Sequence, residues 1–375
     1  MLKKHFSELF DFQKKSKIKA GDGLKLEVGK YPFYTSSNVL TKSIDKYLFD
    51  KPSLIFGTGG LASVHFSSNK FAVSTDCLVA QPKDDKIIFS KYVYHYLSGN
   101  IHILEEGFKG AGLKHISKGY ISNISIPLPS LETQKKIVQI LDDAAALRNK
   151  TEQLIKEYDA LGQSIFFDMF GDPVKNSKGW KSKKLGDICD IGSSRRVFVD
   201  ELVEEGIPFY RGKEIGELST NKSIKSELFI LKEHYENLKK ETGVPKIGDL
   251  LMPSICPDGR ILRVNNNDPF YFKDGRVLWI KIDHLKINSF YLKTFLKELF
   301  YKNYSKIASG TTFAELKIVA LKKIKFLEPP LSLQNEYAEK ITLIEKQKEL
   351  AKQELKESED LFNCLLQKAF KGELV

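Results

Sequence analysis

The sequence predicts an α+β fold that consists of two tandem copies of one unit. Two mixed α/β domains are each followed by one long helix, and the two helices pair antiparallel as a coiled coil about a pseudo-twofold axis. Three observations predict this. A proline-rich joint ending in glutamine occurs as IPLPSLETQ from Ile126 and again as FLEPPLSLQ from Phe326. A long amphipathic segment follows each joint. Short apolar runs separated by glycine, asparagine and aspartate precede each joint and are typical of strands and turns.

The repeat keeps one register around the joint. Residues 110–170 match residues 310–370 without a gap, and Pro129 stands opposite Pro329. Apolar positions agree along the helical part as well as at the prolines. A long ungapped match of this kind indicates a duplication of both the domain and its helix.

A weaker repeat precedes the first. KKHFSELFDF from Lys3 resembles KKLGDICDI from Lys183, and YPFYTSSN from Tyr31 resembles IPFYRGKE from Ile207. The offset is smaller here than around the joint. The second copy must therefore contain extra residues, which we expect within residues 218–243.

The repeat predicts four segments along the chain. The first globular domain is expected at 1–129 and the first helical region at 130–172. The second domain follows at 173–328, and the second helical region at 329–375. Pro173 prevents the first helix from continuing.

Each long helix has an apolar stripe whose members alternate steps of four and three residues, the spacing of a coiled-coil seam. Lys348 and Ser358 interrupt the second stripe with polar side chains. Neither helix can bury its stripe alone, so we expect the two to pair with each other. The alternative is that each helix packs on its own globular part. The predicted seam residues are Ile140, Ala144, Leu147, Leu154, Tyr158, Leu161, Ile165, Tyr337, Ile341, Ile344, Ala351, Leu355, Phe362 and Leu365.

The composition is that of a globular protein with an excess of positive charge. Hydrophobic residues make up 42% of the chain, and 59 lysines and arginines face 48 acidic residues, for a net charge of +11. Such a balance suits a polyanionic partner, although lysines on solvated faces would produce the same number. Charge alone leaves both readings open.

The cysteines and the N-terminus point to a reducing compartment. The four cysteines lie far apart, without a C-x-x-C pair, so neither a zinc site nor a disulfide framework is expected. The first residues, MLKKHFSELFDF, lack the apolar run of a signal peptide. No apolar stretch approaches the length of about 18 residues that a membrane-spanning helix needs. We expect a cytoplasmic protein.

The motifs of common enzymes are missing from the sequence. There is no G-x-x-x-x-G-K-[ST] phosphate loop. FGTGG from Phe56 has no long helix behind it and predicts a tight turn, and NDPFYF from Asn267 has only one of the two prolines of a methylase motif. CPDGR from Cys256 offers Asp258 without a second carboxylate and lysine, so a metal nuclease is not indicated. We predict no catalytic residue and no metal ligand in this chain.

The two domains instead carry polar and basic side chains on glycine-bearing loops. Arginine and asparagine read guanine and adenine edges through paired hydrogen bonds, whereas lysine and serine bind phosphates. Each residue singly is more often an ordinary surface residue; the clustering on corresponding loops is the signal. The candidate DNA-binding residues are Tyr34, Thr35, Ser36, Ser37, Asn38, Thr58, Gly59, Gly60, Lys109 and Lys114 in the first domain, and Arg195, Arg196, Arg211, Lys213, Asp258, Arg260, Arg263, Lys273 and Arg276 in the second.

Together these features resemble the specificity subunit of type I restriction–modification systems. The two joints are similar to that family's P-L-P-x-L-x-x-Q-x-x-I helix entry. WKSKKLGDICDI from Trp180, IPFYRGKEI and GDLLM from Gly248 are similar to further family signatures, as is the stretch from Tyr31 to Phe66. The resemblance covers essentially the whole chain. The second joint departs from the pattern at Tyr337, where isoleucine is usual.

The resemblance implies a non-catalytic subunit of a complex that methylates and cleaves double-stranded DNA. Each domain would read one half of a bipartite site in the major groove, and the helices would set the spacer. Two methylase subunits would dock on the helices and carry S-adenosylmethionine. Motor-nuclease subunits that use ATP and Mg would complete the complex. No cofactor is expected on this chain.

Other classes of function stay open at this level. A type IIB or IIG-like specificity subunit is a close relative of the first reading. A coiled-coil scaffold with protein-binding domains would bind DNA weakly and without sequence preference. An enzyme with an unrecognised site, such as a methylase fragment, would bind S-adenosylmethionine by itself.

Overall fold

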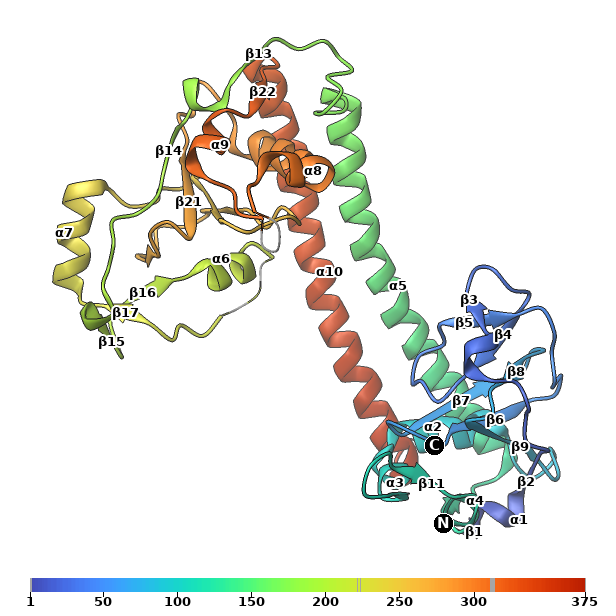
Figure 1. The fold of residues 1–375 in the computed structure, drawn as a ribbon. Coiled ribbons are helices and arrows are strands. Elements are labelled where there is room, and N and C mark those ends of the chain that lie inside the picture. The colour runs from blue at the N-terminus through green and yellow to red at the C-terminus, as the bar shows by residue number, and fades with distance from the viewer. Residues whose placement is uncertain (1, 221, 223, 311–313, 375) are drawn as a thin grey trace. The chain divides into compact units, whose positions relative to one another are not determined.

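The computed structural model of the chain describes residues 2–220, 222, 224–310 and 314–374. The chain divides into two compact units. Unit 1 comprises Met1–Leu154 with Ala351–Val375, and unit 2 comprises Ile155–Leu350. Each unit therefore contains one globular part and a stretch of both long helices, α5 and α10 (Figure 1). The predicted division into four segments stays a prediction.

Unit 1 contains two four-stranded sheets. The first is antiparallel, in the order β2-β9-β6-β7, and its inner strand β6 is buried over its full length because both faces are covered. Its strands are β2 (Phe10–Phe12), β9 (Cys77–Pro82), β6 (Ser53–Gly57) and β7 (Ser63–Ser67). The second sheet has the order β3-β5-β4-β8, in which β4 and β8 run parallel. Its strands are β3 (Leu24–Lys25), β5 (Lys42–Ile44), β4 (Tyr31–Tyr34) and β8 (Ala72–Val73).

Two short strand pairs and a set of helices complete this globular part. β1 (Lys3–His5) pairs with β12 (Ser125–Pro127), which joins the two ends of the domain, and β10 (Phe108–Lys109) pairs with β11 (His115–Ile116). The helices are α1 (Phe6–Leu9), η1 (Ala20–Asp22), α2 (Ser90–Gly99), α3 (His102–Glu105), α4 (Lys118–Ser122) and α5 (Leu131–Phe170).

Unit 2 repeats the two sheets and the end-joining strand pair of unit 1, and an antiparallel bridge between Ser309 and Glu315 stands where unit 1 has the β10–β11 pair. Its sheets have the orders β14-β21-β18-β19 and β15-β17-β16-β20, again with a parallel last pair, and β13 pairs with β22. The strands of the first sheet are β14 (Asp190–Gly192), β21 (Val277–Lys281), β18 (Leu250–Pro253) and β19 (Leu262–Arg263). The remaining strands are β15 (Leu202–Val203), β17 (Phe229–Ile230), β16 (Ile207–Tyr210), β20 (Tyr271–Phe272), β13 (Ser182–Lys184) and β22 (Lys325–Leu327). The predicted tandem fold is confirmed.

The extra residues of the second copy lie in two places. α6 (Gly212–Leu218) follows β16, and α7 (Lys232–Thr242) follows β17, whereas unit 1 has no helix between β4 and β6. The insertion therefore falls on both sides of strand β17. It begins with α6 at Gly212, before the predicted stretch of residues 218–243. Residues 221 and 223 of that stretch lie outside the described residues, as do residues 311–313 of the repeat. The other helices of unit 2 are η2 (Leu185–Asp187), η3 (Val199–Glu201), α8 (Ser289–Ile307), α9 (Ile318–Lys322) and α10 (Leu331–Lys371).

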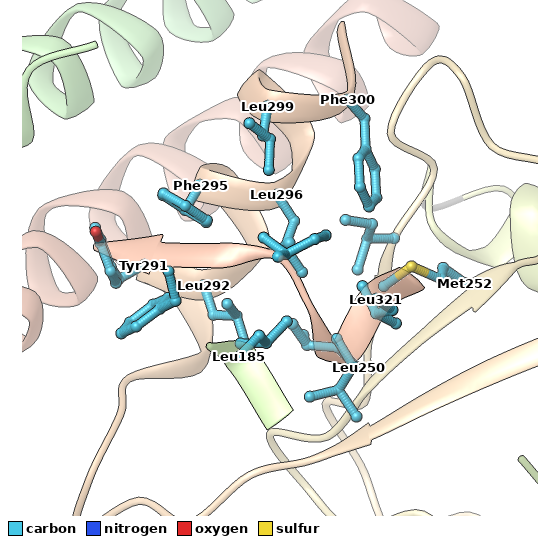
Figure 2. Packing of buried hydrophobic residues seen from close by; sticks show 14 of the residues in the cluster. Leu185, Leu250, Met252, Tyr291, Leu292, Phe295, Leu296, Leu299, Phe300 and Leu321 are labelled. Atoms are coloured by element: carbon cyan, nitrogen blue, oxygen red, sulfur yellow. The ribbon is translucent and has the colours of Figure 1, made fainter. Parts of the chain in front are cut away.

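The core of unit 2 forms where α8 covers the first sheet. The buried residues of α8 recur every three or four positions, which places them on one face of the helix. Figure 2 shows Leu292, Leu296 and Phe300 pointing toward Leu250 and Met252 of β18. The last turns of α5 add Phe166 and Phe170 to this core; the corresponding last turns of α10 add Leu366 and Ala369 to the core of unit 1.

The two long helices pair antiparallel. In unit 1, the early part of α5 meets the end of α10, and the Arg148 guanidinium lies 5.2 Å from the centroid of the Phe362 ring. In unit 2, the end of α5 meets the early part of α10, with ring centroids of Phe166 and Tyr337 5.7 Å apart. Each helix also packs on its own globular part, through Ile137 in unit 1 and Tyr337 in unit 2. The two packing schemes that the sequence left open occur together.

The contact stripe of α5 differs from the predicted seam. Leu147, Leu154 and Leu161 are 44%, 36% and 46% exposed, whereas predicted members such as Ala144, Tyr337, Ile341 and Ala351 are buried. Ile140, Tyr158, Ile165, Ile344, Leu355, Phe362 and Leu365 are half-buried.

The positions one residue later on α5 lie closer to α10. Arg148 stacks on Phe362, and a side chain at Gly162 would come within 3.5 Å of Ile341. A steady alternation of four and three drifts relative to a helix of 3.6 residues per turn, which explains why leucines at the edge of the stripe are left exposed.

The two joints are built alike around a buried glutamine. Gln134 accepts from the Phe89 N–H at 2.8 Å and donates to the carbonyls of Ile87 and Pro129, each at 3.0 Å. Gln334 accepts from the Asn288 N–H at 2.9 Å and donates to the Pro329 carbonyl at 2.9 Å. Phe89 and Asn288 are the residues before the first turns of α2 and α8.

A buried tyrosine repeats in the same place. The Tyr92 hydroxyl donates to the Pro127 carbonyl at 3.0 Å, and the Tyr291 hydroxyl donates to the Leu327 carbonyl at 2.9 Å. Both rings are fully buried. Each joint therefore ties the last strand of a globular part, the helix packed on it and the start of a long helix into one hydrogen-bonded corner.

Candidate nucleic-acid interface

In unit 1 the backbone carbonyl of Asp76 holds two of the predicted loops together. It accepts the Thr58 N–H and the Thr58 Oγ1 hydroxyl, each at 2.9 Å, and the Ser36 Oγ hydroxyl at 2.8 Å. Gly57 permits this approach, because a Cβ there would lie 2.9 Å from the Ser36 Cα. The stretch 35–38 and the β6–β7 loop therefore lie side by side.

The β10–β11 hairpin joins the same place. The Ile116 N–H donates to the Thr58 carbonyl at 3.2 Å, and the His115 Nδ1 lies 3.0 Å from that carbonyl. An antiparallel bridge connects Gly59 with His115, and Lys109 is the partner of His115 within the hairpin. The candidate residues from three separate stretches, including Lys114 at the hairpin tip, thus form one exposed polar surface, which we call the unit 1 loop surface.

Tyr34 has a different role from its neighbours. Its ring is buried against Phe71, with centroids 5.7 Å apart, and burial raises the pKa of its hydroxyl. Ser37 and Asn38 are exposed beyond it, and Thr35 and Ser36 are half-buried. The tyrosine supports the loop from below, while the polar residues after it face solvent.

In unit 2 three basic stretches adjoin. Ser193 Oγ donates to the Val277 carbonyl at 2.7 Å and accepts the Gly275 N–H at 3.0 Å, which fixes the stretch 193–196 beside the β20–β21 turn. The Lys273 N–H donates to the Tyr210 carbonyl at 2.8 Å, which places that turn beside the start of α6. Arg195, Arg196, Arg211, Lys213, Lys273 and Arg276 lie on these three stretches.

The arginines of these stretches are held by carboxylates. Arg196 Nε donates to Asp274 at 3.1 Å, Arg276 Nη1 lies 3.1 Å from Glu315, and Arg195 pairs with Glu241. Exposed ion pairs of this kind contribute at most about 1 kcal/mol each, so phosphates or bases can displace the carboxylates. The pairs orient the guanidinium groups without immobilising them.

Arg211 is held by two carboxylates, whereas Arg195, Arg196 and Arg276 each pair with one. It bonds Glu214 at 2.6 Å and Glu227 at 2.9 Å, and both carboxylates raise its pKa, the Glu214 hydrogen bond most. Burial pushes the pKa of Glu214 up, but the hydrogen bonds from Arg211 outweigh it and the pKa is lowered. Glu214 is only 6% exposed. Arg211 therefore also compensates a buried charge.

Asp258 and Arg260 form an exposed pair on the loop after β18. Arg260 Nε lies 2.8 Å from Asp258, and both side chains are well exposed. A Cβ at Gly216 would come within 3.0 Å of Arg260 Nη1, so this loop lies against α6. Asp258 and Arg260 thereby extend the basic surface, which we call the unit 2 basic surface.

Arg263 does not belong to that surface. Its Nε donates to the Ser289 hydroxyl at 2.7 Å, and its guanidinium lies 4.0 Å from the centroid of the Phe290 ring. Burial lowers its pKa, since the charged form loses hydration there. Arg263 packs the start of α8 onto β19, and sequence alone offered no signal to separate it from Arg260.

Metal-ligating side chains and membrane-spanning helices can be checked over the part of the chain that the structure describes. Among the described residues, no group of three or more His, Cys, Asp or Glu side chains is arranged to hold a metal ion. The same part of the chain has no helix that is both long and apolar enough to cross a membrane.

Corresponding loops of the two globular parts contribute to the two surfaces: the stretch after β16 matches the stretch after β4, and the β18–β19 loop matches the β6–β7 loop. The Leu316 N–H donates to the Ser254 carbonyl at 2.7 Å, as the Ile116 N–H does to Thr58 in unit 1. Comparison with protein families matches one family model to both copies of the repeat. The model of the type I restriction modification DNA specificity domain matches residues 3–157 and again residues 177–359. The chain belongs to this family.

Proteins from two different organisms resemble the chain over most of its length. A candidate type I restriction enzyme specificity subunit from Haemophilus influenzae is 25% identical, with 82% of this chain and 78% of the relative covered. The MjaVIII specificity subunit of Methanocaldococcus jannaschii is 27% identical, with 82% and 75% covered.

A crystal structure has the same fold. The type I restriction-modification S subunit from M. genitalium aligns with a TM-score of 0.65 at 17% identity, covering 98% of this chain and 95% of that one. At this identity the likeness concerns the fold.

Proposed function

We propose that this chain is the DNA-recognition subunit of a type I restriction–modification complex. Each globular part reads one half of a bipartite site, and the paired helices set the distance between the halves. The observation that carries the proposal is the duplication itself. Two domains with one topology bear polar loop surfaces at corresponding places, yet the residues on those surfaces differ.

The chemistry of the surfaces suits a base-reading role. The unit 2 basic surface offers arginines. One arginine side chain can donate two hydrogen bonds to a guanine, one to O6 and one to N7. The unit 1 loop surface offers hydroxyl, amide and lysine groups, which suit phosphates and adenine. Because the two surfaces differ, the two half-sites should have different sequences.

Catalysis belongs to partner subunits in this proposal. Two methylase subunits dock on the paired helices, bind S-adenosylmethionine and methylate adenine, which must leave the base stack for the reaction. Subunits that use ATP and Mg move and cleave the DNA. In this proposal the present chain contributes the choice of sequence and the geometry of the complex, and the partners contribute the catalytic groups and cofactors.

Selection from random duplexes tests the proposal. The full-length chain should enrich a gapped motif, with two constant parts separated by a spacer of fixed length. Co-expression with a methylase partner should then place N6-methyladenine in the same motif in the host genome. Enrichment of one contiguous motif, or no enrichment, would show that the chain does not read a bipartite site.

A further inference from the structure

Two exposed leucines stand out on the polar loop surface of unit 1. Leu61 lies in the β6–β7 loop and is 76% exposed, and Leu113 lies in the β10–β11 loop and is 79% exposed. Single exposed leucines are common on protein surfaces. Two on adjoining hairpin tips, inside a surface otherwise made of hydroxyl, amide and lysine groups, form an apolar spot that water solvates poorly.

The bridge between the hairpins places the leucines together. Gly59 and His115 are antiparallel partners. Leu61 follows Gly59 by two residues, and Leu113 precedes His115 by two. In an antiparallel pair these steps run in the same direction, toward both tips. The two leucines therefore lie on the same side of the bridge, beside Lys114.

The residues around Leu61 and Leu113 indicate that the partner of this apolar spot is nucleic acid. Lys109 and Lys114 are exposed on the same hairpin and Thr58 adjoins it, so the leucines are flanked by groups that bind phosphates. The apolar element that a DNA duplex presents in its major groove is the C5-methyl group of thymine. A leucine pair with a cationic rim is complementary to a thymine methyl between phosphate backbones.

We propose that Leu61 and Leu113 contact thymine methyl groups in the half-site that unit 1 reads, and so specify A·T pairs there. This inference rests on the proposed function. A wedge that unstacks bases is a less suitable role for these leucines. Unstacking requires rigid support, whereas a Cβ added at Gly60 or Gly112 in the two tips would meet no atom within 4 Å, so no neighbouring group packs against either tip on that side.

Replacing thymine by uracil tests the contact, because it removes only the methyl group. The full-length chain first selects its site from random duplexes. Each thymine of that site is then replaced singly by deoxyuridine, and affinity is measured by fluorescence anisotropy at one salt concentration. We expect a loss of roughly fourfold for each contacted methyl group, at one or two positions of one half-site.

Variants connect the loss to the leucines. Leu61→Ala with Leu113→Ala should bind the thymine site about tenfold more weakly and respond no further to deoxyuridine at those positions, since the partner of the methyl is gone. Leu113→Met should keep the response. Leu285→Ala, which changes a leucine of unit 2 that is 87% exposed, is the matched control and should behave as the parent chain.

The other outcomes separate the two proposals. If no sequence is enriched, the proposed function fails and this inference fails with it. If a site is enriched but deoxyuridine has no effect at any thymine, or affects the double variant as strongly as the parent, the leucine contact alone is overturned. A rise of 2-aminopurine fluorescence that depends on the leucines would assign them to base unstacking and would likewise overturn the methyl contact.

Discussion

Gln134 and Gln334 show how single residues hold the two joints. Each is buried, and its side-chain amide bonds the backbone N–H before a helix and the carbonyl of a joint proline. The first prediction follows from this burial. Gln134→Ala should lower the free energy of unfolding of unit 1 by about 2–3 kcal/mol, because an N–H and two carbonyls lose their partner.

Urea denaturation of the full chain, followed by limited proteolysis to assign the unfolded part, measures the effect. Gln139→Ala is the control on the same helix, because Gln139 is exposed and its side chain bonds the neighbouring Asp143 side chain. Its effect should stay within about 0.5 kcal/mol. Equal effects of the two substitutions would contradict the role of the buried amide.

Arg260 and Arg263 stand three positions apart and should respond in opposite ways. Arg260→Ala should relax specificity at one position of a single half-site and weaken binding by roughly tenfold to a hundredfold. Arg263→Ala should instead reduce folding stability, since it removes the stack on Phe290 and the bond to Ser289, and should leave the selected motif unchanged.

Selection of random duplexes with each variant, with thermal melting in parallel, compares the two arginines. If Arg263→Ala alters the motif without lowering the melting temperature, the assignment of Arg263 to packing is incorrect. Weakening of both half-sites by Arg260→Ala would show that Arg260 does not act within one half.

His95 should make the stability of unit 1 depend on pH, because its imidazole is buried. Burial lowers the pKa of its imidazole from the ordinary 6.5, although the bond to Asp142 at 3.0 Å opposes the shift, and Lys91 also binds Asp142. A lowered pKa means that the unfolded chain binds the proton more readily. The contribution is therefore complete above about pH 6.5 and is lost as the pH falls through the folded-state value.

Denaturation between about pH 7.5 and pH 5 should show the decline, with a slope of at most about 1.4 kcal/mol per pH unit from this group. His95→Gln should flatten the curve over that range. A parent chain whose unit 1 is equally stable throughout the range would refute this role of His95.

At the scale of elements, the helix pair is the part whose length can be changed without touching the loops. One heptad inserted after Thr151, matched by one after Ala351, keeps the antiparallel register and lengthens each helix by about 10 Å. The buried hydroxyls of Thr151 and Ser358 bond carbonyls four residues earlier, so these two polar groups are satisfied within their own helices.

The insertion should lengthen the spacer of the methylated motif by about three base pairs, given a rise of about 3.4 Å per pair, and leave the bases of both halves unchanged. Mapping N6-methyladenine in cells with the methylase partner measures both. Substituting residues on the outer face of the helices without changing their length is the control. An unchanged spacer would show that the helices do not set the distance between the two half-sites.

At the scale of the whole molecule, we expect the net charge to govern the proposed DNA affinity. The chain carries a net charge of +11, and both loop surfaces include lysines or arginines. If about six to ten phosphates are contacted, affinity should fall by roughly a thousandfold to a hundred-thousandfold between about 50 and 200 mM salt. Anisotropy titrations over this range test the expectation, and a flat response would contradict a DNA-binding role.

The sequence by itself determined the tandem fold, the two joints and the family. These follow from local signals: prolines stop and start helices, apolar spacing marks strands and helices, and a repeat in one register preserves both. The match of Pro129 with Pro329 already showed that one supersecondary unit was written twice. Such information lies along the chain and needs no coordinates.

Only the tertiary structure decided which side chains meet. It brought the β6–β7 loop to the β10–β11 hairpin, placed Arg263 against Phe290, and turned the contact stripe of α5 toward Arg148 and Gly162. These facts depend on packing between segments far apart in sequence, where a small rotation of a helix exchanges one residue for its neighbour. Apolar periodicity predicts that a helix has an apolar face. Which residues of that face make contact depends on the shape of the surface that packs against the helix.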